Sequence, residues 1–217
     1  MRISYIIMLI LITLVVALCY RKRSLLCTPL FIFFLFFTLG VEVVADILKY
    51  TFDANNLWVY NLYIYLSFPC WFYWLTKKVK SKPPILFLFS TTLFSITILV
   101  ENVQISNIWG LDSLSFFIGT VIFVLLFIIK IFKAYAISDE IIPAYQLLFY
   151  MAGLVFYVGF FFDILLYPTG LLSQTVLAQM NLDQIISRLI NIFYYCTLVI
   201  SILKGVPLQK RWIMQRR

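Results

Sequence analysis

The chain has 217 residues, of which 64% are hydrophobic, 19% aromatic and only 12% charged, and its mean hydropathy is +1.01. This composition lies far outside that of soluble globular domains, which excludes a water-soluble enzyme or binding domain. The net charge of +8 lies almost entirely beside the ends of apolar segments, so it indicates membrane topology rather than nucleic-acid binding.

The first apolar segment is predicted to stay as a membrane anchor. A secretory signal peptide carries its positive charge before the apolar region, whereas here Arg21, Lys22 and Arg23 follow an uncharged run. Six further apolar segments can be read along the chain. Together they occupy residues 5–20, 26–49, 57–76, 85–101, 114–134, 147–167 and 182–203.

The lengths of these segments predict seven membrane-spanning helices. Each is near the ~20 residues needed to cross a hydrocarbon core of about 30 Å, and none shows the period-two alternation of a membrane barrel strand. Backbone polar groups in lipid must be satisfied internally, which helices achieve. We predict an all-α polytopic fold with one domain over residues 1–217 and a basic cytoplasmic tail over 204–217.

The basic residues predict the orientation. Most of the 17 lysine and arginine residues lie in four regions: between segments one and two, between segments three and four, near the end of segment five, and after segment seven. With seven alternating crossings these regions share one face, which the positive-inside rule makes cytoplasmic. The N-terminus is then outside and the C-terminus inside. The tail mixes basic residues with Trp212, Ile213 and Met214, so it predicts contact with anionic lipid or with a cytoplasmic partner.

Seven polar side chains from four segments are predicted to form one layer near the outer face. They are Glu42, Asp46, Asn61, Asp163, Arg188, Asn191 and Tyr195. Charged groups in a membrane helix usually face the bundle interior or water and pair with one another. We therefore predict a polar pocket that opens away from the cytoplasm.

The charges of this layer indicate its ligand only broadly. Glu42 and Asp46 are four residues apart and share a helix face, and Arg188 is the natural counter-charge. Such a site suits a cation, a proton or a zwitterion. The alternative is that the same groups form an interhelical network that only fixes helix packing.

Segments two and three resemble segments six and seven. Asn61-Leu-Tyr-Ile-Tyr65 stands against Asn191-Ile-Phe-Tyr-Tyr195, and the outward helix of each pair carries an acid. With segment four left over, this predicts a three-plus-one-plus-three arrangement of parallel repeats, as in some transporters. Chance similarity in an aromatic-rich chain is the alternative.

The sequence lacks the residues that several kinds of site require. The chain has no histidine, only seven glycines and no glycine-rich phosphate-binding motif. We therefore predict no metal site, no cofactor and no enzymatic activity, although Glu42, Asp46 and Asp163 would be the residues of an intramembrane enzyme.

The stretch from Glu42 to Asn61, with Asn55, Asn56 and Tyr60 within it, resembles a family of uncharacterised seven-helix membrane proteins from Bacteroidota. The resemblance extends loosely over most of the chain and includes the regions around Pro143, Gly153 and Gly159. Family members carry a further acid near the position of Ser67, where this chain differs. The resemblance implies seven membrane helices in a bacterial inner membrane and an association with sensor kinases, but no established function.

These observations predict a non-enzymatic sensory or signalling accessory module. Occupancy of the outer pocket would shift helix packing, and a cytoplasmic partner would read the change through the basic loops and tail. The alternative is a small-solute or ion transporter or channel. That alternative requires polar groups to continue toward the cytoplasm beyond Ser67 and Tyr195, where the sequence offers few.

Overall fold

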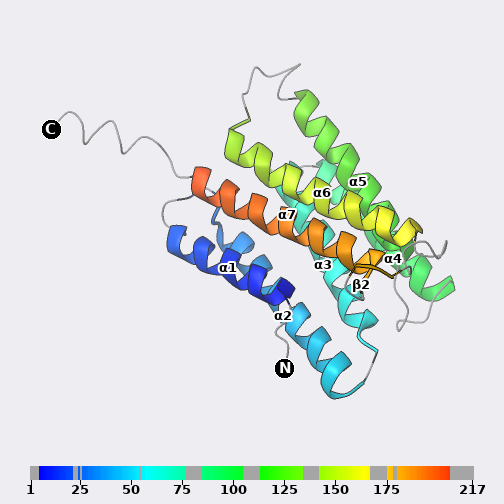
Figure 1. Cartoon of the computed structure of the whole chain (residues 1–217). Coiled ribbons are helices and arrows are strands. Elements are labelled where there is room, and N and C mark those ends of the chain that lie inside the picture. Colours follow the sequence, from blue (N-terminus) through cyan, green and yellow to red (C-terminus); the bar gives the residue numbers. More distant parts are fainter. Residues whose placement is uncertain are drawn as a thin grey trace, which may run out of the picture.

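The computed structural model describes residues 5–21, 24, 26–53, 55–76, 85–104, 113–133, 142–166, 175–177 and 180–205. Within these residues the chain forms seven helices, which confirms the predicted helical class (Figure 1). They are α1 (Tyr5–Tyr20), α2 (Pro29–Thr51), α3 (Leu57–Thr76), α4 (Ile85–Gln104), α5 (Ser113–Phe132), α6 (Ala144–Leu166) and α7 (Leu182–Lys204).

Capping side chains explain where α2 and α3 begin. α2 starts at Pro29 rather than at residue 26, because Thr28 accepts a hydrogen bond from the Phe31 amide and proline fits the first helical position. α3 starts where the Asn55 side chain accepts a hydrogen bond of 2.9 Å from the Leu57 amide. The sequence signals for these boundaries are therefore short-range.

Five of the helices are long and apolar enough to cross a membrane: α2, α4, α5, α6 and α7. α1 is a shorter apolar helix, and α3 has 20 residues but is rich in tyrosine and tryptophan, which lowers its hydropathy. These helices make the chain a multi-pass membrane protein. The seven-crossing topology stays a prediction.

Each helix packs against the next one along the chain, and α7 also packs against α1. α3 also packs against α5, so it contacts α2, α4 and α5. Among its side chains Phe68, Trp71 and Phe72 are completely buried, which places α3 at the centre of the core.

Aromatic rings fill the core between α3, α6 and α7. Phe68 stacks on Tyr157 with ring centroids 4.5 Å apart, and Trp71 stacks on Phe149 at 4.7 Å. Offset and edge contacts of this kind stabilise a core beyond the area they bury. Gly153 makes room for this packing, since a Cβ there would lie 2.8 Å from the Trp71 ring.

The two ends of the bundle differ in charge and in local structure. At one end Gly205 follows α7 and lies against Ser24, in the turn between α1 and α2, and the basic residues Arg21 and Lys204 lie beside this contact.

A short antiparallel ribbon, β1 (Thr175–Leu177) and β2 (Met180–Asn181), precedes α7. This ribbon was not predicted, because strands of two or three residues are too short to leave a pattern in the sequence.

Candidate functional site

Glu42 of α2 acts on polar groups of two other helices, α3 and α7. Its half-buried carboxylate interacts electrostatically with the phenol groups of Tyr60 and Tyr63 on α3 and of Tyr195 on α7. Asp46, one turn further along α2, also acts on it. Ionisable groups inside membrane helices are costly, so this position is the first candidate for a functional residue.

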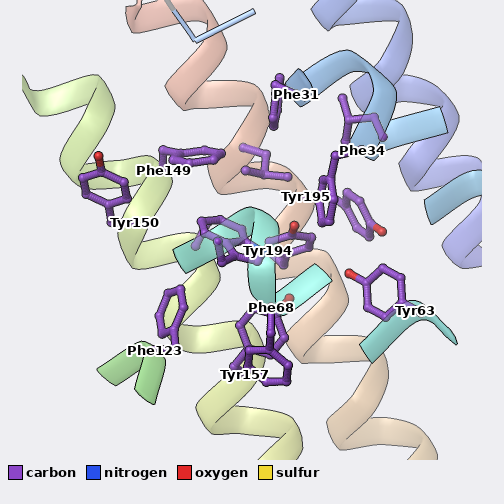
Figure 2. Close-up of a cluster of buried hydrophobic side chains, with 14 of the residues drawn as sticks. Phe31, Phe34, Tyr63, Phe68, Phe123, Phe149, Tyr150, Tyr157, Tyr194 and Tyr195 are labelled. Atoms are coloured by element: carbon purple, nitrogen blue, oxygen red, sulfur yellow. The ribbon is translucent and has the colours of Figure 1, made fainter. Parts of the chain in front are cut away.

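Four tyrosines continue the polar environment from Glu42 into the bundle. We call them the tyrosine cluster: Tyr63 of α3, Tyr157 of α6, and Tyr194 and Tyr195 of α7. All four are buried, and the phenol group of Tyr63 interacts with those of the other three. Figure 2 shows the Tyr63 hydroxyl pointing from α3 into the bundle, toward the α7 tyrosines.

Two hydroxyls of the tyrosine cluster have unused hydrogen-bonding capacity. The side chains of Tyr63 and Tyr157 are 9% and 0% exposed. Their hydroxyls approach each other, and those of Thr38 and Ser67, but neither makes a hydrogen bond of good geometry within the described residues. The neighbouring Thr38 hydroxyl donates to the Phe34 carbonyl at 2.8 Å, and Ser67 donates to Ile64. Each tyrosine hydroxyl can therefore donate to, or accept from, a bound polar group.

The structure brings only some of the predicted residues to Glu42. Asp46 and Tyr195 are its neighbours. Asn61 and Asn191 are both buried, and Asn191 donates to the Ser187 carbonyl of its own helix at 2.8 Å. The side chain of Asp163 lies outside the described residues.

Arg188 has an exposed side chain, and its predicted role as the counter-charge of Glu42 stays a prediction. Its side chain is exposed near the start of α7, and Lys49 is the basic residue that acts on Asp46. A long arginine near a helix end reaches the membrane interface easily, which explains its exposure.

The inner tyrosines and one buried carboxylate were not predicted from the sequence. Tyr63, Tyr157 and Tyr194 were not distinguished from the many aromatic residues expected at membrane interfaces. Glu101 of α4 is 2% exposed and accepts hydrogen bonds from the backbone amides of Leu114 and Ser115, at 2.8 and 2.6 Å. It caps the first turn of α5 and is therefore a structural joint between two helices.

The described part of the chain contains no group of three or more histidine, cysteine or acidic side chains that could hold a metal ion. Comparison with protein families, curated proteins and solved structures finds no match to this chain. The resemblance to a family from Bacteroidota therefore stays a prediction.

Proposed function

We propose that this integral membrane protein binds a small polar solute between Glu42 and the tyrosine cluster, and that it acts as a sensory or signalling module. One observation carries the proposal: the half-buried Glu42 carboxylate acts on the buried Tyr63 hydroxyl, and neither this hydroxyl nor that of the adjacent Tyr157 makes a hydrogen bond of good geometry within the described protein. Structural polar groups in a core are normally satisfied by one another. Hydroxyls with spare capacity on α3 and α6, close to a carboxylate on α2, favour a ligand site over packing alone.

The signal would leave the site through α7. Tyr194 and Tyr195 lie on this helix, and Gly205 at its end lies against the turn between α1 and α2. A solute that bridges α3 and α7 would stabilise one arrangement of these helices over another. Its binding would therefore shift the protein toward that conformation. The basic residues at that end support a cytoplasmic location under the positive-inside rule, where a partner or anionic lipid would respond.

The test is thermal stability of the detergent-solubilised protein against a panel of small metabolites and ions, for wild type and Glu42→Gln. We expect at least one compound to stabilise wild type and to lose this effect in the variant, because glutamine keeps the shape but removes the charge. Asp53→Asn is the matched control. Asp53 is an exposed acid with a φ of 48°, a conformation that asparagine tolerates well. A flat response in all three proteins would contradict the proposal.

A transporter is the second candidate, and one packing feature favours it. If α1, α2 and α3 correspond to α5, α6 and α7, the contact between α3 and α5 corresponds to that between α7 and α1, and α4 is left over. This is the packing that a three-plus-one-plus-three repeat would give. In addition, the buried indole N–H of Trp71, four residues beyond Ser67, has no partner among the described residues.

Flux separates the two candidates. The compound that stabilises the protein would be offered, in labelled form, to proteoliposomes that contain wild type or Glu42→Gln. Uptake by wild type only would establish transport. Binding without uptake is the result that the sensory proposal expects.

A further inference from the structure

The charged side chain that acts on Glu42, four residues along α2, is also an acid. Among the described residues, the charged group that acts on Glu42 is a second carboxylate, Asp46. Lys49 acts on Asp46, and its ammonium lies 5.7 Å from the centre of the exposed Tyr50 ring, at the end of α2. A bound anion would therefore meet like charge, whereas a cation would find an acceptor for its charge.

The walls of the site are aromatic. Phe37 stacks on Tyr63 with centroids 6.3 Å apart, and Tyr194 and Tyr195 meet edge to face at 4.8 Å. The faces of aromatic rings carry negative potential and attract cations, most strongly where water is excluded. Burial of these tyrosines provides such a setting.

The remaining polar groups match the donors of an ammonium group. A protonated primary amine has three N–H donors and no acceptor. An ionised carboxylate such as Glu42 accepts hydrogen bonds, and the hydroxyl oxygens of Tyr63 and Tyr157, which lie close to each other, make no hydrogen bond of good geometry within the described residues. A quaternary ammonium would satisfy the charge but could not donate to these oxygens.

We infer that the solute bound between Glu42 and the tyrosine cluster is a small protonated amine. The inference rests on the proposed function and specifies its ligand class. Glu42 supplies the counter-charge, the tyrosine rings surround the cation, and the Tyr63 and Tyr157 hydroxyls accept its N–H groups. Specificity against neutral analogues follows from the carboxylate, which a neutral solute would leave unpaired.

Four probes test the ligand class on the purified full chain: ethylammonium, tetramethylammonium, ethanol and acetate. Binding is followed by thermal shift and by isothermal titration. We expect ethylammonium to bind best, tetramethylammonium more weakly, and ethanol and acetate not at all. Tyr63→Phe should weaken ethylammonium binding about tenfold, the value of one hydrogen bond to a charged group.

Tyr50→Phe is the matched control, because it also removes a phenol hydroxyl, but from a ring that is 75% exposed. It should bind ethylammonium as wild type does, and the unliganded melting temperature of each variant reports whether it folds. Equal or tighter binding of ethanol, acetate or tetramethylammonium would overturn the amine inference and leave the proposed site intact. If these probes and the whole metabolite panel fail to stabilise wild type, the proposed function fails as well.

Discussion

Glu101 and Glu42 both lie within apolar helices, but their surroundings differ. Glu101 has a structural role, whereas Glu42 is a candidate functional residue. Glu101 has both oxygens engaged, by the amides of Leu114 and Ser115. Its burial is therefore compensated by charge-assisted hydrogen bonds and by the positive end of α5. Glu42 instead faces Asp46 and phenol groups with spare bonding capacity. Such an arrangement costs stability unless something else is bound there.

The role of Glu101 leads to a stability prediction. Glu101→Ala would leave two amides at the start of α5 without their acceptor, and we expect it to cost about 3 kcal/mol. Glu101→Gln keeps one acceptor oxygen, so its cost should be about half as large. Denaturant unfolding of the solubilised variants measures both. Equal stability of Glu101→Ala and wild type would show that the cap contributes nothing.

At the scale of the helices, small residues determine how closely elements approach. A Cβ at Gly153 of α6 would lie 2.8 Å from the Trp71 ring, whereas one at Gly40 of α2 would have no neighbour within 4 Å. We expect Gly153→Ala to destabilise the protein by about 2 kcal/mol through overpacking.

Gly40→Ala is the matched control for this prediction. It makes the same chemical change in a helix of the same bundle, at an exposed position, and should be neutral or gain about 0.5 kcal/mol from helix propensity. Thermal unfolding in detergent compares the two variants. A similar effect of both substitutions would contradict the close packing of α6 on α3.

The helices could be predicted from the sequence, but much of the site could not. Apolar runs and capping residues such as Thr28 act on neighbouring residues, so the starts and ends of helices can be predicted from short stretches of sequence. The tyrosine cluster depends on which faces of α3, α6 and α7 meet. In a chain with 14 tyrosines, composition alone cannot distinguish a core tyrosine from an interfacial one. Glu101 was missed for the same reason, since its partners lie on the next helix.

For the whole molecule, the predicted topology can be tested directly. In a variant without the native cysteines, Asp53→Cys should react with a membrane-impermeant maleimide from outside intact cells. Gln215→Cys, in the basic tail, should react only after the cells are permeabilised, because five crossings separate the two positions in the seven-crossing topology. Labelling of both from the same side would contradict it.

The most direct test of the ligand site is a high-resolution cryo-electron-microscopy map of the protein in lipid nanodiscs with ethylammonium present. The proposal predicts ordered density within hydrogen-bonding distance of the Tyr63 and Tyr157 hydroxyls and of Glu42. It would be contradicted by a map in which both hydroxyls bond to protein atoms and the tyrosine cluster closes on itself without added density.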